Sequence, residues 1–387
     1  MVNFDNLEIA FQSKNNSELR KAYYLFKLVG NQTFVKTGKI LLNIALKLHF
    51  PLKPFVKPTI FSHFCGGESI EECDVTISKL HQYGIGTILD FSAEGAHTEE
   101  GFDNVTQELL QVIEKAKNNP AIPFAVFKMT GVARFELLEK LSSKTTLSEI
   151  ESQEYQRVKN RINQLCKACY TYNLPIFIDA EESWIQDAID TLTEEMMALY
   201  NKEKAIIFNT LQMYRHDRYF YLQSFVQKAR AQNFKIGIKF VRGAYMEKER
   251  ERAAEKSYPT PIQLTKADSD RDYNKALEYS LLNLDIISFC VGTHNEESCK
   301  LVTNQMNILN LQHNHPQIWF AQLLGMSDHI SFNLSKEGYN VAKYVPYGAV
   351  NLVLPYLIRR AEENTSVAGQ TGRELSLIMK ELKRRKQ

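Results

Sequence analysis

Two adjacent arginines, Arg359 and Arg360, have the most distinctive chemistry in the sequence. Tyr356 precedes both by about one helical turn, Glu363 follows both by one turn, and apolar residues accompany them, so we expect an amphipathic helix here. Neighbouring guanidinium groups repel each other unless they share an anion, and their planar forks suit a carboxylate. The segment alone is compatible with a carboxylate-binding helix or with a solvated charged face.

The overall composition is that of an ordinary globular protein. The chain has 387 residues, of which 44% are hydrophobic and 24% charged, which is enough for a barrel-sized domain with an extension. A formal net charge of +2 gives no strong field for nucleic acid, so no nucleic-acid partner is expected. Residues 380–387 are locally basic, and we expect a solvated helix end there, with contact to anionic lipid as the alternative.

The cysteines and the N-terminus bear on the cellular compartment. Six irregularly spaced cysteines favour free thiols over a disulfide framework. Cys166 and Cys169 match C-x-x-C, but no second ligand pair stands at zinc spacing, so no metal is predicted. The N-terminus shows no secretory or transit signal, and the apolar stretch 40–48 is too short to span a bilayer. A cytoplasmic location is expected.

The elements that would position the arginines follow a regular rhythm. Helical periodicity over residues 17–49, followed by Pro51, Pro54 and Pro58, predicts a helical arm and connector within residues 1–80. Eight apolar runs then alternate with helix-length polar segments, at residues 87–91, 123–129, 175–179, 205–211, 236–241, 286–291, 317–322 and 341–345. This alternation predicts an α/β fold, a (β/α)8 barrel over residues 84–370, with a basic helix or tail at 371–387. An open doubly wound sheet is the alternative, but no G-x-G-x-x-G motif opens a helix after the first strand.

Polar side chains gather at the C-terminal ends of these predicted strands, where (β/α)8 barrels hold their active sites. They are Asp90, Glu94, Lys128, Thr130, Asp179, Glu181, Glu182, Gln212, Tyr214, Lys239, Arg242, Thr293, His294, Asn295, Gln322 and Tyr344. A salt bridge at the barrel rim would explain any single one of them. A ring of this length indicates a ligand site, because buried charges are costly unless paired or functional.

Three motifs resemble the proline dehydrogenase family: KFVRGAYMEKER at 239–250, IDAEE at 178–182 and YLIRRAEEN at 356–364. With FCGGE at 64–68, the resemblance runs from the arm to the arginine helix and is closest to the stand-alone, eukaryote-like members. It implies a distorted (β/α)8 barrel that binds FAD at its strand ends and oxidises L-proline to Δ1-pyrroline-5-carboxylate. It further implies that electrons pass to a membrane quinone, from a peripheral position on the inner face of the membrane.

The resemblance also implies roles for individual residues around the cofactor. Gln212 would hydrogen-bond the isoalloxazine, and Lys239 would place a positive charge beside it, where many relatives have arginine. The other residues implied to contact FAD are Ala180, Arg242, Gly243, Ala244, Thr293, His294 and Glu363. The alternative for Lys239 is an ion pair with Asp179 or Glu181.

Around the substrate, the resemblance implies that Arg359, Arg360 and Lys128 bind the carboxylate of proline. Tyr344, Tyr356 and Leu323 would pack on the ring carbons. Asp179, implied with Lys239 as a catalytic residue, would support Lys128 and the arginines or the substrate amine. Glu94 would pair with the first arginine as a gate, with a solvated loop carboxylate as the alternative.

Three other functions remain open from the sequence. The first is hydroxyproline oxidation on the same fold; relatives with that activity resemble this chain but have a smaller residue in place of Tyr344, so a preference for L-proline is expected. The second is a flavin-free aldolase-like enzyme that uses Lys128 or Lys239 as a Schiff-base amine. The third is a non-catalytic protein that docks to membranes through its arm and basic tail.

Overall fold

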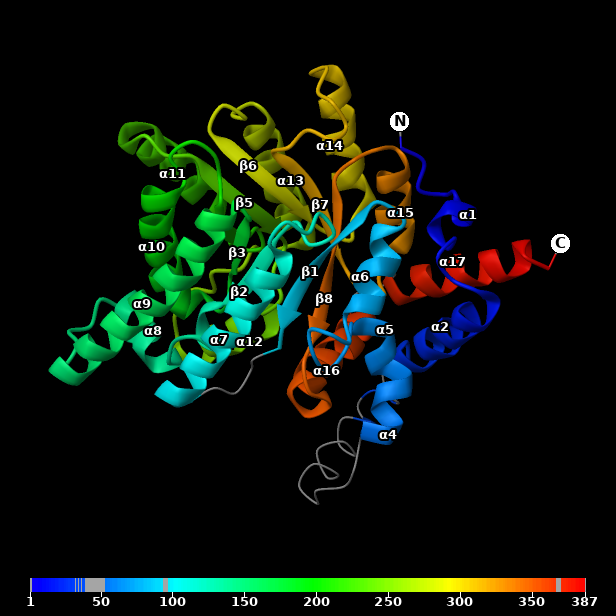
Figure 1. The fold of residues 1–387 in the computed structure, drawn as a ribbon, viewed down its shortest axis with the longest axis horizontal. Coiled ribbons are helices and arrows are strands. Elements are labelled where there is room, and N and C mark those ends of the chain that lie inside the picture. Colours follow the sequence, from blue (N-terminus) through cyan, green and yellow to red (C-terminus); the bar gives the residue numbers. More distant parts are fainter. Residues whose placement is uncertain are drawn as a thin grey trace.

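The computed structural model describes residues 2–31, 33, 35, 37–38, 53–92, 97–366 and 370–386, with the backbone alone for 362–366, 370 and 371. Eight parallel strands alternate with helices, which confirms the predicted α/β barrel (Figure 1). Hydrogen-bonded neighbours follow the order β1-β8-β7-β6-β5-β4-β3-β2. The seam between β1 and β2 is joined by the bridge between Ile88 and Phe124, so the barrel is distorted and nearly closed.

All eight predicted strands are present, with ends shifted by at most two residues. The strands are β1 (Ile85–Phe91), β2 (Ala125–Lys128), β3 (Ile176–Asp179), β4 (Ile207–Gln212), β5 (Ile236–Val241), β6 (Ile287–Gly292), β7 (Ile318–Leu323) and β8 (Val341–Tyr347). Their apolar runs are buried on both faces, as expected for parallel strands covered by helices.

Aromatic side chains fill the inside of the barrel. Phe124 and Phe177 stack with ring centroids 4.3 Å apart, and Phe208 meets Phe124 edge-on at 5.7 Å. Gly237 on β5 is paired in register with Phe208, and a Cβ at this glycine would lie 2.5 Å from the Phe208 ring. The glycine therefore leaves the volume that the phenylalanine occupies, and the interior is a packed core beneath the strand ends.

Helices cover the outside of the barrel between successive strands. These helices are α7 (Glu99–Ala116), α8 (Phe135–Ser142), α9 (Glu149–Tyr172), α10 (Ser183–Tyr200), α11 (Arg218–Gln232), α12 (Met246–Lys256), α13 (Lys266–Leu281), α14 (Glu296–Ile308) and α15 (Asp328–Lys336), with a 3-10 turn at Met129–Gly131. Helix α16 (Val350–Ser366) follows the last strand and packs against α2 (Asn16–Val29), α4 (Lys53–Val56) and α17 (Gln370–Arg384). Several of the covering helices have defined N-terminal caps. The Ser148 side chain accepts from the Glu151 backbone N–H, for example, while the Glu151 carboxylate accepts from Ser148 N–H, and this satisfies two otherwise orphan donors.

The N-terminal arm and the C-terminal helix lie together on one side of the barrel (Figure 1). The arm consists of α1 (Leu7–Ala10), α2 (Asn16–Val29), α4 (Lys53–Val56), a π-helical turn (Lys57–Phe61), α5 (Ser62–Phe64) and α6 (Asp74–His81). The predicted helix over 17–49 thus begins as α2, and the apolar stretch 40–48 lies outside the described residues.

The C-terminal helix α17 (Gln370–Arg384) packs against α2 through an apolar cluster that includes Phe26 and Ile378. Just past its end, Arg385 donates hydrogen bonds to the carbonyls of Phe11 and Lys14, at 2.9 and 2.8 Å. The C-terminus is therefore anchored on the arm, and the expectation of a simply solvated helix end is wrong for Arg385. Among the described residues, no helix has the length and apolarity needed to cross a membrane.

Candidate active site

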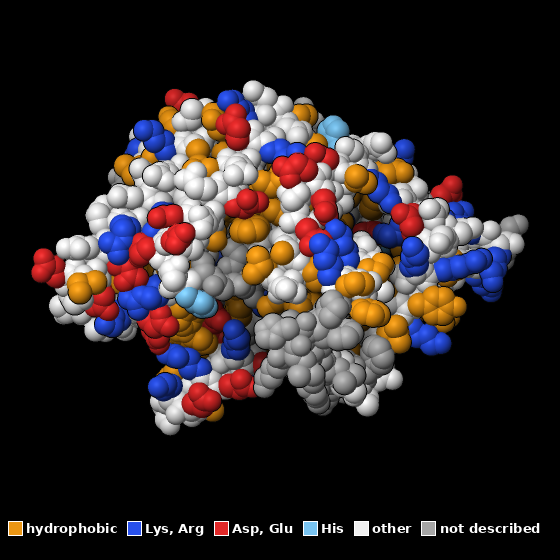
Figure 2. All heavy atoms as spheres, turned by 60° about the horizontal axis from the view of Figure 1, so that its bottom comes forward, with side chains coloured by type: hydrophobic (Ala, Val, Ile, Leu, Met, Phe, Trp, Pro, Cys, Tyr) orange, Lys and Arg blue, Asp and Glu red, His pale blue; other side chains and the backbone are white. Residues whose placement is uncertain are grey.

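The carboxyl ends of the strands open on the side to which β1 and β8 point in Figure 1, and Figure 2 turns that side towards the viewer. Three predicted site residues from distant strands meet just inside this mouth. Lys239 of β5 donates hydrogen bonds to the Oδ1 atom of Asp179 on β3 and to the hydroxyl of Tyr344 on β8. The Tyr344 hydroxyl is also 3.3 Å from Asp179 Oδ1.

Lys239 is only 4% exposed, and its ammonium lies over two aromatic rings, 4.4 Å from the Tyr344 centroid and 5.2 Å from that of Phe177. A buried ammonium needs such partners, because burial without them costs several kcal/mol. Burial, followed by the nearby Asp179 carboxylate, raises the pKa of Tyr344 well above its usual range, so this phenol stays protonated. The cluster is therefore one fixed positive charge held by one carboxylate at the floor of the mouth.

Asp179 bonds to Lys239 and Tyr344, and its support of Lys128 and the arginines or of the substrate amine stays a prediction. Its bond to Lys239 is the ion pair that we gave as the alternative for Lys239. Lys128 ends β2 half-buried, next to Asp179 in the ladder between β2 and β3. The two residues are therefore neighbours along the mouth.

The loop after β3 is fixed by a second set of contacts. Gln212 donates from Nε2 to the Glu181 carbonyl at 2.6 Å, and its Oε1 accepts from the Ala244 backbone N–H at 3.4 Å. Thr130 donates to the Glu181 carboxylate from both its N–H and its hydroxyl. Burial raises the pKa of Glu181 to about 7 against the opposing effect of the Thr130 hydrogen bonds. The Gln212 amide is thus oriented by backbone at both ends.

Gly243, just after β5, has a backbone that no other residue could adopt easily. Its φ is +128°, and a Cβ there would lie 2.6 Å from the ring of Tyr214. The residue before it, Arg242, donates to Asp270, Thr293 and Ser298, at 2.6, 2.7 and 3.0 Å. Gly243 and Ala244 remain exposed at the mouth, so their backbone is accessible to a ligand.

Thr293 and His294 follow β6 directly. Thr293 Oγ1 accepts from Arg242 and also from the backbone N–H of Asn295, at 3.1 Å. His294 Nδ1 lies 2.9 Å from the hydroxyl of Ser327. Burial, reinforced by the charges of Lys343 and Arg360, lowers the pKa of His294 to about 3, so the imidazole is neutral at physiological pH.

The arginine segment is a helix, α16, as predicted. Arg360 is 7% exposed and its guanidinium lies 5.0 Å from the ring centroid of Tyr356, which is equally buried. A solvated charged face is therefore wrong for Arg360, while Arg359 is half-buried. The side chain of Glu363 and all of Glu94 lie outside the described residues, so their predicted roles remain predictions.

Leu323 and Ala180 also lie at the mouth as predicted, at the ends of β7 and β3. Leu323 pairs in register with Tyr344 of β8. Among the residues that the structure describes, no group of three His, Cys, Asp or Glu side chains could hold a metal ion. All six cysteines are free, as their spacing predicted, and all six are buried.

The sequence analysis missed four residues that support the site: Asp270, Ser327, Lys343 and Glu374. Lys343 is completely buried on the face of β8 opposite to Tyr344, where it pairs with Asp328 at 2.9 Å. A lysine in the middle of an apolar strand was a usable signal, because such a position needs a buried partner. Ser327 and Glu374 gave no signal, since nothing local shows that they meet.

Comparisons with known proteins agree on one family. The family model described as Proline dehydrogenase matches residues 73–373. The chain is 35% identical to proline dehydrogenase 1, mitochondrial, of Dictyostelium discoideum, over 97% of this chain and 74% of that protein. It is also 35% identical to the carbapenem antibiotics biosynthesis protein CarD of Pectobacterium carotovorum, covering 84% of each chain, and 29% identical to a hydroxyproline dehydrogenase of Xenopus laevis.

Among solved structures, proline utilization A from Bdellovibrio bacteriovorus superposes with a TM-score of 0.73 at 18% identity. The match covers 93% of this chain and 38% of that longer one. At this level of identity the likeness concerns the fold, and it agrees with the barrel described above.

Proposed function

Because the chain belongs to the proline dehydrogenase family, we propose that it oxidises L-proline to Δ1-pyrroline-5-carboxylate with FAD as cofactor and passes the electrons to a membrane quinone. The observation that carries this proposal is a pair of buried cations. The ammonium of Lys239 lies at the floor of the barrel mouth, and the guanidinium of Arg360 is buried on helix α16. One fixed cation suits an electron-accepting ring, and the other suits a carboxylate.

The residues at the mouth fit FAD in two respects. The exposed backbone at Gly243 carries no side chain, and this lets an extended cofactor approach closely. The donors on this side of the mouth, Arg242 and Thr293, suit a phosphate-bearing group, while the Gln212 amide and Lys239 suit the polar edge of a flavin. Bound there, FAD would supply the two-electron acceptor that amino-acid side chains lack.

Lys239 would stabilise negative charge that develops beside it during the reaction. Its ammonium is already oriented by Asp179 and Tyr344, so little reorganisation is needed when that charge appears. The same contacts prevent it from acting as a free amine, which argues against Schiff-base chemistry at this residue.

Arg360, with Arg359 and Lys128, would bind the proline carboxylate. Arg360 is held over the Tyr356 ring, so its planar fork is oriented before substrate arrives. Leu323, Tyr344 and Tyr356 would cover the apolar ring carbons. This arrangement would fix the substrate at both ends and exclude water from its reactive carbon.

Tyr344 supports L-proline over 4-hydroxyproline as the substrate. The phenol is 7% exposed and its hydroxyl is already engaged by Lys239 and Asp179, so it cannot readily turn away to admit an added hydroxyl group. An apolar pocket alone would discriminate only modestly against the added hydroxyl. The remaining discrimination would come from the volume that the Tyr344 ring fills.

Contact with the membrane would involve the arm. Tyr24 and Leu28 of α2 and Phe55 of α4 are 62%, 47% and 63% exposed. Large exposed apolar side chains near lysines are typical of surfaces that touch lipid headgroups. Flotation with anionic liposomes would test this: the triple variant Tyr24→Ser, Leu28→Ser, Phe55→Ser should remain in the protein fraction while the wild type floats. Flotation of both would contradict the role of these three side chains.

The activity is tested by incubating the purified, FAD-loaded protein with L-proline and a soluble quinone and trapping the imine product with o-aminobenzaldehyde. We expect a yellow adduct that depends on all three components. Product formation from 4-hydroxyproline with equal efficiency would contradict the assignment of L-proline as the preferred substrate.

A further inference from the structure

Helix α17 reaches from the far end of the chain into the loop that joins β7 to α15. Its residue Glu374 is 5% exposed, and Oε1 accepts a hydrogen bond from the backbone N–H of Ser327 at 2.7 Å and lies 3.4 Å from the Ser327 hydroxyl. A carboxylate is costly to bury without such donors. The contact is therefore specific to this loop.

Ser327 connects this carboxylate to a residue of the mouth. Its hydroxyl lies 2.9 Å from His294 Nδ1, and its backbone has φ +51°, a left-handed conformation at the start of α15. Few residues other than glycine and asparagine adopt that conformation without cost. The strained backbone places one serine between Glu374 and His294.

The single hydroxyl hydrogen of Ser327 has two possible acceptors, the Glu374 carboxylate at 3.4 Å and His294 Nδ1 at 2.9 Å. With that hydrogen directed to Glu374, the serine oxygen would accept from His294 Nδ1–H. The other ring nitrogen, Nε2, then carries a lone pair. The arrangement selects one tautomer of a neutral imidazole, because the hydrogen bond at one nitrogen decides which nitrogen is protonated.

Helix α17 also contacts the segment that follows His294 in the chain. Arg373, next to Glu374, forms an ion pair with Glu296, the first residue of α14. Glu296 is two positions after His294 in the chain. Helix α17 is thus attached to the loop between β7 and α15, which contacts His294, and to α14, which begins just after His294.

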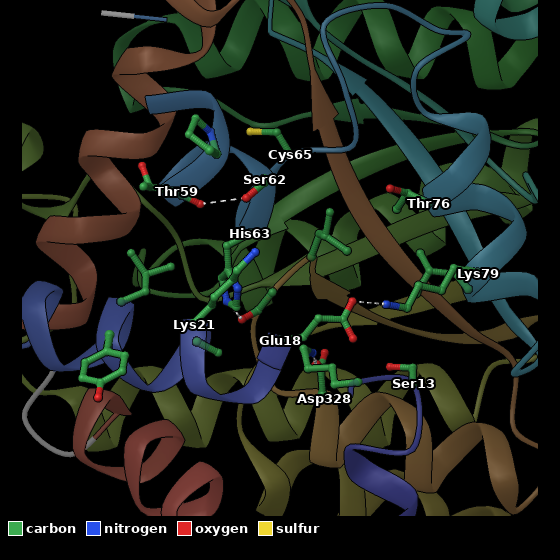
Figure 3. A pocket seen from close by; sticks show the side chains of 18 of the residues that line it. Ser13, Glu18, Lys21, Thr59, Ser62, His63, Cys65, Thr76, Lys79 and Asp328 are labelled. Atoms are coloured by element: carbon green, nitrogen blue, oxygen red, sulfur yellow. Dashed lines mark hydrogen bonds and ion pairs between the residues drawn. The ribbon is translucent and has the colours of Figure 1, made fainter. Parts of the chain in front are cut away.

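The loop itself is held from two further directions. Lys343 donates to the carbonyls of Met326 and Leu323, at 2.5 and 3.3 Å. His63 of the arm lies 2.9 Å from the Gly325 carbonyl, and Lys14 pairs with Asp328. Figure 3 shows His63 and Asp328 in the groove of about 620 Å³ between the arm and this loop. The loop therefore offers Ser327 as a fixed point rather than a mobile contact.

We propose that Glu374 and Ser327 are positioning residues that fix the orientation and tautomer of the His294 imidazole, which makes helix α17 part of the cofactor site. The proposal rests on the proposed function in one respect, namely that FAD is the ligand of His294. The oriented imidazole would present Nε2 as a hydrogen-bond acceptor to the cofactor, while Nδ1 is fully used by the protein.

Two variants isolate the relay. Ser327→Gly removes the hydroxyl and keeps both the backbone N–H and a residue that tolerates positive φ. Glu374→Ala removes the acceptor, whereas Glu374→Gln keeps an oxygen for the Ser327 N–H and should be milder. Glu381→Gln is the matched control, because Glu381 is a buried carboxylate of the same helix that pairs with Arg384 and Arg385 instead.

The tautomer is read by ¹⁵N NMR of histidine-labelled protein without cofactor, with His294→Gln to assign the signal. We expect a protonated Nδ1 in the wild type and in Glu381→Gln, and a shift towards protonated Nε2 in Ser327→Gly and Glu374→Ala. A wild-type ring protonated at Nε2, or a signal that is the same in all variants, would overturn the positioning role.

The affinity for FAD, measured by fluorescence quenching on titration of the apoprotein, tests the link to the cofactor. Loss of one hydrogen bond should weaken FAD binding about three- to tenfold in Ser327→Gly and Glu374→Ala, with the KM for proline close to that of the wild type. Glu374→Ala also removes the acceptor of the Ser327 N–H and should lower the thermal stability of the apoprotein, whereas Ser327→Gly keeps that bond and should not. A changed tautomer with unchanged FAD affinity would overturn the assignment of α17 to the cofactor site. A wild-type protein that binds no FAD would instead contradict the proposed function, and the NMR result would still decide the relay.

Discussion

The ammonium of Lys239 and the phenol of Tyr344 are in direct contact across the barrel, with Nζ donating to the hydroxyl and lying 4.4 Å from the ring centroid. Lys239, which we expect to act on the cofactor, and Tyr344, which we expect to shape the substrate pocket, therefore fix each other's position. Asp179 accepts from both and completes the unit. Substitution of any one of the three should affect the other two.

The first prediction concerns the charge of Lys239. Lys239→Met should lower the midpoint potential of the bound flavin and slow its reduction by proline roughly tenfold or more, because a cation beside developing negative charge is lost. Spectroelectrochemistry and anaerobic stopped-flow absorbance measure the two effects. Lys239→Arg keeps the charge and should be milder. An unchanged potential in Lys239→Met would mean that the lysine is only the ion-pair partner of Asp179.

The second prediction concerns the carboxylate clamp. Hydrogen bonds to a charged group contribute roughly 1.5–3 kcal/mol, so Arg360→Met should lower kcat/KM for proline about ten- to a hundredfold. Flavin content should not change. The matched control is Arg230→Met, since Arg230 is a half-exposed arginine in the last turn of α11 that pairs with Asp285, which precedes β6 at the amino ends of the strands. If Arg360→Met bound proline normally, the clamp assignment would be wrong.

The third prediction concerns substrate preference. The wild type should favour L-proline clearly over 4-hydroxyproline, and Tyr344→Ser should lose activity on proline while narrowing or reversing this preference, because it empties the volume beside the ring. Tyr344→Phe fills the same volume without the hydroxyl, so it should keep the preference. Steady-state kinetics on both substrates decide the matter, and an unaltered ratio in Tyr344→Ser would refute the role of Tyr344.

The fourth prediction concerns pH. Burial raises the pKa of Glu181 to about 7 in the folded protein from 4.5 in the unfolded chain, so the folded state binds the proton more tightly between these values. This contribution to stability is full below pH 4.5 and is lost as the pH rises through 7, and it amounts to about 3 kcal/mol. The glutamine of Glu181→Gln does not titrate. The free energy of unfolding in urea, taken as variant minus wild type, should therefore be more favourable to the variant at pH 8 than at pH 5. A difference between the two proteins that is independent of pH would contradict the assignment.

The strands were predictable because their physics is local. A run such as residues 236–241 is apolar throughout and bounded by polar segments, so it is recognisable as a covered parallel strand, and β5 has those bounds. The same logic put Asp179, Lys239 and Tyr344 at the mouth, since the carboxyl ends of parallel strands share one edge.

The ion pair of Lys239 with Asp179 could be given from the sequence only as one of two alternatives, because the choice of partner depends on the order of strands around the barrel and on side-chain reach. Asp179 bonds to Tyr344 of β8 as well as to Lys239 of β5, and the contact with Tyr344 was not expected. Contacts between segments far apart in the chain, such as Glu374 with Ser327, leave no periodic trace in a single sequence. Only the buried Lys343 gave a local hint that such a partner must exist.

The central claim is that this chain reduces a bound flavin with L-proline, and one spectrum tests it most directly. The purified protein should be yellow, with flavin absorbance that bleaches on anaerobic addition of L-proline and returns when a quinone is added. A flavin that stays oxidised in excess L-proline, or a colourless protein that takes up no FAD and is trapped by borohydride with a carbonyl substrate, would contradict the account.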